Sequence, residues 1–215
     1  MAIDAQLADQ VRRNLAPPTL RIYRWNQPAI SLGRRQSLDD LPAPLLSRGI
    51  PIVHRPTGGG AVVHRLDELT YALAISRSNV PSEISLHGLP GVIHRHLRDF
   101  LGSRGWVSPN ELTIAEGHFR GSIRKGSSAT VCFESPVSGD LLYRGQKVAG
   151  SALRVWRDGL LLQGSLQGFP LSRELQRQAL LQAVSQTFGA IWRPPPKGFV
   201  RKERFELSRA KPIGF

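Results

Sequence analysis

Apolar residues recur at helical spacing in several stretches of the chain. In residues 2–15 the apolar positions lie four apart, which places them on one face of a helix. Residues 89–101 group their apolar side chains on one side, and their polar residues, His94 among them, are expected on the outer side. The pattern predicts a further helix over residues 173–188 and a short one over residues 41–48.

Shorter apolar segments bounded by turn residues predict strands. We expect strands at residues 19–23, 29–32, 50–54, 60–64, 69–76, 140–143, 148–153, 154–156 and 160–166. A turn at residues 26–28 is expected to join the first two strands, and turns at residues 144–147 and at Asp158-Gly159 predict two hairpins. Hairpins mixed with helices indicate an α+β fold with a mixed, largely antiparallel sheet flanked by helices.

Length and composition limit the classes of protein to consider. The chain has 215 residues, of which 40% are apolar, and this fits one domain, expected over residues 1–196 with a basic C-terminal tail over residues 197–215. No apolar run is long enough to span a bilayer, and the first residues lack the order of a secretory signal. The single cysteine excludes an internal disulfide framework and a Cys-rich metal site. We therefore expect a soluble, cytoplasmic protein without a metal site or a membrane partner.

The chain carries a large excess of positive charge. Lys and Arg total 29 and Asp and Glu total 16, which gives a net charge of +13. Such an excess favours encounter with a polyanion, and nucleic acid is the usual candidate. The basic residues are spread along the whole chain, however, without a helix-turn-helix, a zinc-ligand pair or an aromatic RNA-binding signature. A basic rim that meets an acidic protein partner is the competing interpretation.

The sharpest local motif is RPTGGGAVVH, which runs from Arg55 to His64. Three successive glycines permit positive φ angles and let a ligand approach the backbone closely. Taken alone, however, such a segment is more often a glycine-rich hairpin turn than a ligand-binding loop. No Gly-Lys-Ser/Thr follows, so the segment is not a Walker loop.

Cys132 and Lys147 are further candidates for chemistry. A lone cysteine is most often buried and inert, but a lysine beside it would favour the thiolate, which is the nucleophilic form. Lys147 adjoins a predicted hairpin turn, where a lysine is usually an exposed, solvated charge. The small residues at positions 149–152 leave room on the following strand for something other than side-chain packing.

Taken in order, these motifs resemble the lipoate-protein ligase and octanoyltransferase family, whose catalytic domain is also similar to that of biotin-protein ligase. The resemblance covers residues 1–166. The segments that carry it are MAID at 1–4, PTLRIYRW at 18–25, SLGRRQ at 31–36, RPTGGGAVVH at 55–64, LTY at 69–71 and GQKVAGSA at 145–152. The segment CFESP at 132–136 resembles the cysteine-dependent octanoyltransferases rather than the ATP-using ligases, which typically carry an Arg-Asn-Asp-like segment before the lysine motif.

The resemblance implies a biotin/lipoate protein ligase-like catalytic domain and a set of site residues. Cys132 would accept the acyl group as a thioester, and Lys147 would hold the acyl carbonyl and favour the thiolate. The implied substrate-binding residues are Arg55, Thr57, Gly58, Gly59, Gly60, Ala61, His64, Gly150, Ser151 and Ala152. The sequence departs from the family pattern at Arg65, where an acidic residue often follows the histidine, and at Gln163, where a histidine commonly precedes Gly-Ser/Thr.

The implied reaction moves an octanoyl group from acyl carrier protein to a lysine of a lipoyl domain or of the glycine-cleavage carrier protein. Because the donor is already a thioester, this transfer needs no cofactor. The carrier proteins are acidic, which would account for the charge of +13 without specific binding of nucleic acid. Two alternatives stay open: an ATP-dependent lipoate-protein ligase, which would use ATP and Mg²⁺ while Cys132 only packs, and a family member that binds without turnover.

Overall fold

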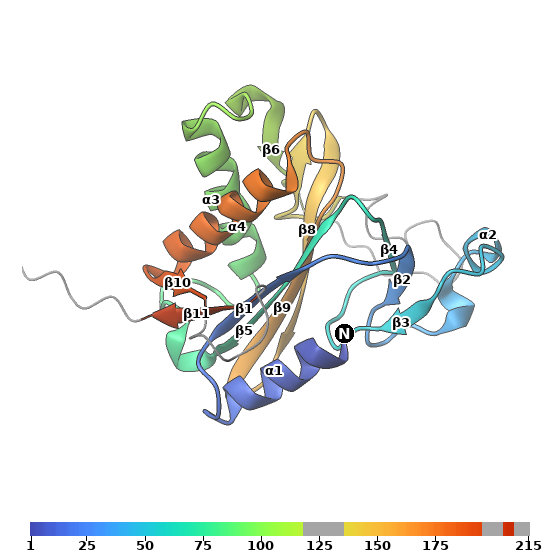
Figure 1. Ribbon diagram of the computed structural model, residues 1–215, viewed down its shortest axis with the longest axis horizontal. Coiled ribbons are helices and arrows are strands. Elements are labelled where there is room, and N and C mark those ends of the chain that lie inside the picture. The colour runs from blue at the N-terminus through green and yellow to red at the C-terminus, as the bar shows by residue number, and fades with distance from the viewer. Residues whose placement is uncertain (118–135, 195–203, 209–215) are drawn as a thin grey trace, which may run out of the picture.

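The computed structural model of the chain describes residues 1–117, 136–194 and 204–208, the last of these by its backbone. Its strands form two sheets (Figure 1). The main sheet has the strand order β10-β11-β1-β5-β9-β8-β7-β6, and a small sheet has the order β3-β2-β4. Cys132, the expected nucleophile, lies outside the described residues.

The helices are α1 Ala2–Arg12, α2 Ala43–Leu46, α3 Leu89–Ser103 and α4 Arg173–Phe188, with 3-10 helices η1 Leu38–Asp40, η2 Arg77–Asn79 and η3 Pro109–Glu111. The strands of the main sheet are β1 Thr19–Tyr23, β5 Leu69–Ser76, β6 Leu112–Ile114, β7 Leu141–Tyr143, β8 Gln146–Val155, β9 Gly159–Leu166, β10 Ile191–Arg193 and β11 Arg204–Ser208. The strands of the small sheet are β2 Ala29–Leu32, β3 Ile52–His54 and β4 Val62–His64.

The central strands β5 and β9 pair along their whole length and are buried on both faces. Successive residues of a strand point to opposite faces. In β5 the larger side chains Tyr71, Leu73 and Ile75 join the core with α3 and α4, and the small Ala72 and Ala74 pack with α1. Figure 1 shows α3 and α4 together on one side of the main sheet and α1 on the other. The expected α+β class with a largely antiparallel sheet is confirmed.

The small sheet corrects two expectations about strand pairing. The strands at residues 19–23 and 29–32 form where expected, but they are not a pair, since β1 lies in the main sheet and β2 in the small one. The glycine segment does not close a hairpin either. It connects β3 to β4, which flank β2 on opposite sides, β3 parallel and β4 antiparallel to it. A Cβ on Gly33 would overlap the Gly59 carbonyl oxygen, so the segment crosses close to the end of β2.

Both expected hairpins are confirmed. Arg144 and Gly145 form a two-residue turn with positive φ angles of 49° and 78°, as the twist of a tight hairpin requires. Asp158 lies in the turn between β8 and β9, and Gly159 is the first residue of β9. The Trp156 N–H donates to the Gly159 carbonyl at 2.8 Å. The strands expected separately at residues 148–153 and 154–156 form one continuous strand, β8.

All four predicted helices form, but three have different bounds: α1 and α2 are shorter than predicted, and α3 continues to Ser103. α4 spans the residues predicted for it, and Gly189 ends it in the left-handed conformation. α1 ends at Arg12 rather than at residue 15, because Asn14 takes a positive φ of 57°. Leu15, the last apolar residue of the predicted helix face, is consequently 74% exposed. In the described part of the chain, no helix is both long and apolar enough to cross a membrane.

Residues 204–208 fall in the segment that the sequence predicted to be a basic tail. They form β11, which pairs with β10 and with β1 at one edge of the main sheet. This part of the predicted tail is therefore a strand of the sheet. The division of the chain into a domain over 1–196 and a tail over 197–215 otherwise stays a prediction.

A hydrogen-bonded group connects the centre of the sheet to α3. Tyr71 on β5 lies opposite Gly164 on β9, and its hydroxyl reaches across that glycine to Ser151 Oγ on β8, at 2.6 Å. A Cβ on Gly164 would lie 2.5 Å from the Tyr71 hydroxyl oxygen. The glycine therefore lets an aromatic side chain span the middle strand of three.

His94 corrects another expectation, because it is not on the outer side of α3 but buried, with 1% of its surface exposed. Its Nδ1 lies 2.6 Å from the Gly139 carbonyl oxygen, which can only accept, so Nδ1 carries the proton. Nε2 then accepts from Ser151 Oγ at 3.0 Å. Burial lowers the pKa of His94, with the Gly139 hydrogen bond and Asp140 acting in the opposite direction and Lys147 adding to the lowering. The neutral ring holds the chain at Gly139 against β8.

Replacing Gly164 by alanine is expected to destabilise the protein, because the added methyl group overlaps the Tyr71 ring. Overpacking of this kind costs about 1–3 kcal/mol, measurable as a lower urea midpoint with an unchanged slope. Gly58→Ala is the matched control, since nothing lies within 4 Å of a Cβ there. Equal midpoints for the two variants would contradict the assigned role of Gly164.

The lowered pKa of His94 predicts a pH dependence of stability. The unfolded chain binds a proton on this histidine below a pH of about 6.5, whereas the folded protein keeps the ring neutral to lower pH. The stability contributed by the neutral ring is thus complete above that pH and is lost as the pH falls through it, by at most about 1.4 kcal/mol per pH unit. Urea unfolding between pH 7.5 and 5 should show a weaker dependence in His94→Gln than in the exposed control His87→Gln. A wild-type slope in His94→Gln would contradict the prediction.

Candidate active site

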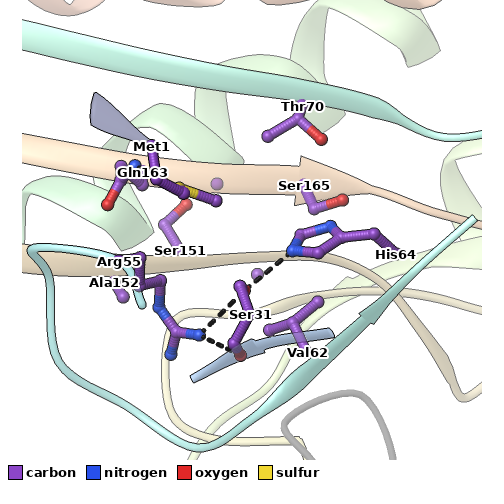
Figure 2. Close-up of a pocket in the computed structure, with 12 residues that line it drawn as sticks. Met1, Ser31, Arg55, Val62, His64, Thr70, Ser151, Ala152, Gln163 and Ser165 are labelled. Atoms are coloured by element: carbon purple, nitrogen blue, oxygen red, sulfur yellow. Dashed lines mark hydrogen bonds between the residues drawn. The ribbon is translucent and has the colours of Figure 1, made fainter. Parts of the chain in front are cut away.

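A pocket opens where the small sheet meets β5, β8 and β9 of the main sheet (Figure 2). Its lining residues come from the first residue of the chain, from the small sheet and glycine segment, and from the three main-sheet strands. They are Met1, Ser31, Arg55, Val62, His64, Thr70, Gly150, Ser151, Ala152, Gln163, Gly164 and Ser165. The pocket thus brings together two motifs that lie about ninety residues apart in the sequence.

The predicted binding residues fall into two groups. Arg55, His64, Gly150, Ser151 and Ala152 line the pocket. The remaining ones, all in the glycine segment, surround it. Thr57 donates to a pocket residue, Gly58 and Gly59 line a neighbouring groove, the Gly60 carbonyl accepts from Arg55, and Ala61 packs in the core of the small sheet.

Arg55 holds the glycine segment in its conformation. Its Nη2 donates to the carbonyls of Gly58 and Gly60 at 2.7 and 2.6 Å, and its Nη1 donates to the Ser31 carbonyl at 2.9 Å and to Ser31 Oγ at 3.1 Å. The guanidinium is buried and planar, so it fixes several carbonyls at once. The three glycines are therefore arranged around a cation that bends the segment toward β2, on the side where the pocket lies.

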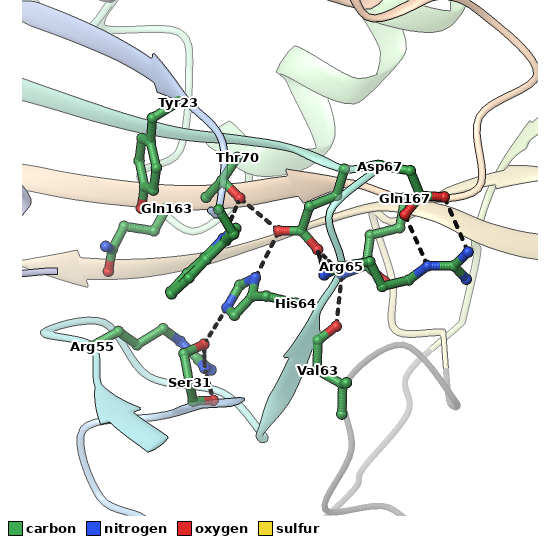
Figure 3. Close-up of polar contacts among 12 residues, drawn as sticks. Tyr23, Ser31, Arg55, Val63, His64, Arg65, Asp67, Thr70, Gln163 and Gln167 are labelled. Atoms are coloured by element: carbon green, nitrogen blue, oxygen red, sulfur yellow. Dashed lines mark hydrogen bonds and ion pairs between the residues drawn. The ribbon is translucent and has the colours of Figure 1, made fainter. Parts of the chain in front are cut away.

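His64 lies between a carboxylate and a hydroxyl. Its Nδ1 donates to Glu68 Oε1 at 2.7 Å, its Nε2 lies 2.7 Å from Ser31 Oγ, and the Trp25 ring stacks on it with ring centroids 4.1 Å apart (Figure 3). These contacts fix both the position and the plane of the imidazole. His64 thus lines the pocket in a fixed orientation.

The carboxylate of Glu68 is fully buried and accepts further hydrogen bonds. Thr70 Oγ1 and Gln167 Nε2 each donate at 2.6 Å, and the Arg65 N–H donates at 3.0 Å. Burial by itself would raise the pKa of Glu68, but the hydrogen bond and charge of His64, together with the hydrogen bonds from Thr70 and the Arg65 N–H, lower it below its usual range. The side chain of Arg65, where the sequence departs from the family pattern, turns outward to the exposed Asp67.

Gln163, the other departure, connects the glycine segment to α1. Its Oε1 accepts from Thr57 Oγ1 at 2.8 Å, and its Nε2 donates to Asp4 Oδ2 at 2.7 Å. The buried Asp4 also accepts from Arg21 at 2.7 Å and from the Tyr23 hydroxyl at 2.9 Å. A glutamine here satisfies both neighbours. Sequence reasoning missed Asp4, because an acidic residue in the first turn of a helix needs no further explanation.

Lys147 was expected to be exposed at a hairpin, and this is wrong. The hairpin turn is formed by Arg144 and Gly145, so Lys147 already lies within β8. Its Nζ pairs with Asp140 Oδ2 at 2.7 Å, and only 1% and 4% of the two side chains are exposed. A Cβ on Gly150 would lie 2.9 Å from Nζ, so glycine at this lining position makes room for the amine. The buried charge pair therefore lies beside the pocket.

Cys132 lies outside the described residues, and its distance from Lys147 is therefore not defined. The described segments on either side of it, represented by Glu116 and Val137, line one groove together with Asp140 and Ser151. Among the described residues, no three His, Cys, Asp or Glu side chains are grouped as metal ligands would be.

Residues 1–183 match the family model described as the lipoyl protein ligase A/B catalytic domain. The octanoyltransferase LipM of Oceanobacillus iheyensis is 36% identical over 181 residues, which cover 82% of this chain and 60% of that protein. LipM of Symbiobacterium thermophilum is 37% identical over 240 residues, which cover 100% of this chain and 81% of that protein. The chain thus spans 60% of the length of the first relative, which is less than two thirds, and 81% of the second.

The fold is similar to solved lipoate-protein ligases. A lipoate protein ligase of T. acidophilum, solved with bound lipoic acid, has a TM-score of 0.61 at 17% identity, and the match covers 87% of this chain and 81% of that one. Lipoate-protein ligase A bound with ATP also has a TM-score of 0.61 at 17% identity, with 88% and 81% covered. At this identity the likeness establishes the fold alone, and it confirms the expected lipoate-ligase-like architecture. With the family match over residues 1–183 and relatives above one third identity, the chain belongs to the lipoyl protein ligase A/B catalytic domain family.

Proposed function

We propose that the protein moves an octanoyl group from a thioester on acyl carrier protein to a lysine of a lipoyl domain. The observation that carries the proposal is the pocket in which the glycine segment faces the strand that bears Lys147, in a chain related to octanoyltransferases. The glycine-cleavage carrier protein is a second acceptor of the same kind. The proposal keeps the expected cytoplasmic location, and the net charge of +13 favours encounter with acidic carriers.

The reaction has two acyl transfers. In the first, the Cys132 thiolate attacks the octanoyl carbonyl and the carbon–sulfur bond to the donor breaks. The donor leaves as a thiolate, which takes up the proton released when Cys132 ionised. In the second, the ε-amine of the acceptor lysine attacks the Cys132 thioester. An amide bond forms, and the thiol of Cys132 is restored with a proton from the amine. Because each thioester is already activated, neither step requires ATP or a metal.

Lys147 would act on the oxyanion that forms in each transfer. Its ammonium lies next to Gly150 in the pocket wall, and the pairing with Asp140 holds it there. A preorganised cation in a site of low polarity stabilises developing negative charge without reorganising, and it also favours the thiolate form of a nearby cysteine. Backbone N–H groups of the glycine segment are further donors available to the oxyanion.

An ATP-dependent lipoate-protein ligase is the alternative function, favoured by the fold shared with such ligases. In that reaction ATP and Mg²⁺ would activate free lipoate as an acyl-adenylate, Lys147 would contact the adenylate, and Cys132 would only pack. The two functions differ in whether a covalent acyl-enzyme forms in the absence of ATP.

Cys132→Ser tests the covalent intermediate. Incubation of the wild-type protein with octanoylated acyl carrier protein, without ATP, should add the mass of one octanoyl group, and hydroxylamine should remove it. The variant should not gain this mass, because the chain has a single cysteine. Transfer at the wild-type rate by Cys132→Ser would refute the acyl-enzyme, and turnover that requires lipoate and ATP would favour the ligase.

Lys147→Met should slow acylation by about a hundredfold, the effect of removing one oxyanion donor. It should also lower the free energy of unfolding by about 3–5 kcal/mol, because Asp140 is left buried without its partner. The double variant Lys147→Met/Asp140→Asn removes both charges and should regain much of the stability but none of the rate. Parallel recovery of stability and rate would reduce Lys147 to a structural role; folding is followed by urea unfolding and acylation by intact mass.

A further inference from the structure

A groove of about 690 Å³ lies next to the pocket and is not used by the proposed chemistry. Its lining residues include Arg34, Arg35 and Arg154, together with Gly58 and Gly59. Arg34 and Arg35 are exposed, while Arg154 is half-buried. Three cations and a stretch without side chains are features of sites that bind phosphate groups.

The described lining residues of this groove carry more positive than negative charge. Within residues 1–117 and 136–194, no carboxylate lies within ion-pair distance of Arg34, Arg35 or Arg154. Asp40 also lines the groove, but its carboxylate accepts from the Ser37 N–H at 2.8 Å. An anion bound in the groove would therefore meet three cations that form no ion pair with a described carboxylate.

Arg154 is held in place although no carboxylate in the described part of the chain pairs with it. Its guanidinium lies over the Trp156 ring, 4.4 Å from the centroid, and Arg12 lies over the same ring at 4.7 Å. Arg12 is paired with Asp158 at 2.8 Å. Burial, and then the nearby cations Arg34 and Arg12, lower the pKa of Arg154. When an anion binds, a cation that is partly desolvated among other cations contributes more favourable electrostatic free energy than an exposed cation does.

The groove and the pocket lie along one strand. Gly150, Ala152 and Arg154 alternate along β8 and so point to the same face of the sheet. The first two line the pocket, and Arg154 lines the groove. Arg154 follows Gly150 by four residue steps along the strand, which is about 13 Å. A ligand with its acyl group in the pocket could therefore place an anion in the groove only through an extended arm.

We infer that this groove binds the phosphate of the acyl donor's prosthetic arm, a phosphodiester that carries the thioester at the other end of a flexible chain, as in phosphopantetheine. This inference rests on the proposed function. It assigns Arg34, Arg35 and Arg154 to recognition of the donor, while the acyl chain and thioester occupy the pocket. The phosphates of a nucleotide share the same chemistry and are separated from the donor arm by the experiment.

The test compares octanoyl-phosphopantetheine with octanoyl-pantetheine, which lacks the phosphate, as donors to the full-length protein. The wild-type kcat/KM for acylation should be about tenfold or more higher with the phosphate, the effect of one charge-assisted hydrogen bond. In Arg154→Gln and Arg34→Gln the ratio of the two values should fall toward one. Arg48→Gln, which removes an exposed charge elsewhere, should keep the wild-type ratio.

Several results would overturn the inference. A wild-type ratio near one, or an equal loss of ratio in Arg48→Gln and Arg154→Gln, would reduce the groove to general electrostatic attraction. If Arg154→Gln weakens ATP binding but not phosphopantetheine binding, measured by calorimetry, the groove serves a nucleotide. Calorimetry with phosphopantetheine that carries no acyl group also tests the groove when no acyl transfer occurs, so failure of the proposed function is distinguishable from failure of this inference.

Discussion

The arrangement of the two sheets depends on the hydrogen bonds that the buried carboxylate of Glu68 accepts. It accepts hydrogen bonds from His64 at the end of β4, from Thr70 on β5 and from Gln167 just after β9. The small sheet and the main sheet are thus joined through one buried, ionised group. The pocket lies at this junction, so its shape follows from the way in which Glu68 positions His64 relative to β5 and β9.

Other buried charged groups around the pocket also join elements that are far apart in the sequence. Asp4 pairs with Arg21, and Lys147 pairs with Asp140. Buried ion pairs contribute little net stability compared with apolar packing, but removing one partner is costly. Such pairs therefore tolerate few alternative geometries. Here they hold α1, β1 and β8 in positions that leave glycines and small residues, rather than bulky side chains, along the pocket.

This construction fits acyl transfer better than it fits a simple binding role. A binding pocket for an apolar chain needs no buried ammonium, whereas a reaction that develops an oxyanion is accelerated by one. The arginine groove lies farther along the same face of β8. Under the proposed function, the pocket would hold the acyl part of a long donor and the groove its anionic end, each beside residues of matching chemistry.

The sequence by itself determined the local elements and the family. Helical period and turn residues predicted α4, β1, β2 and both hairpins, because these signals come from residues that are close in the chain. The glycine and lysine motifs identified the family for the same reason.

Only the tertiary structure decided which strands pair and which way polar side chains point. β2 pairs with β3 and β4 in the small sheet and not with β1. The glycine segment therefore connects β3 to β4 across the end of β2, and it is not a hairpin turn. His94 and Lys147 were expected to be exposed, yet both are buried, because their partners Gly139, Ser151 and Asp140 come from other parts of the chain. A periodic pattern predicts which residues share one face of a helix or strand. A polar group is buried only where a hydrogen-bond partner satisfies it, and a partner from a distant part of the chain is brought there only by folding.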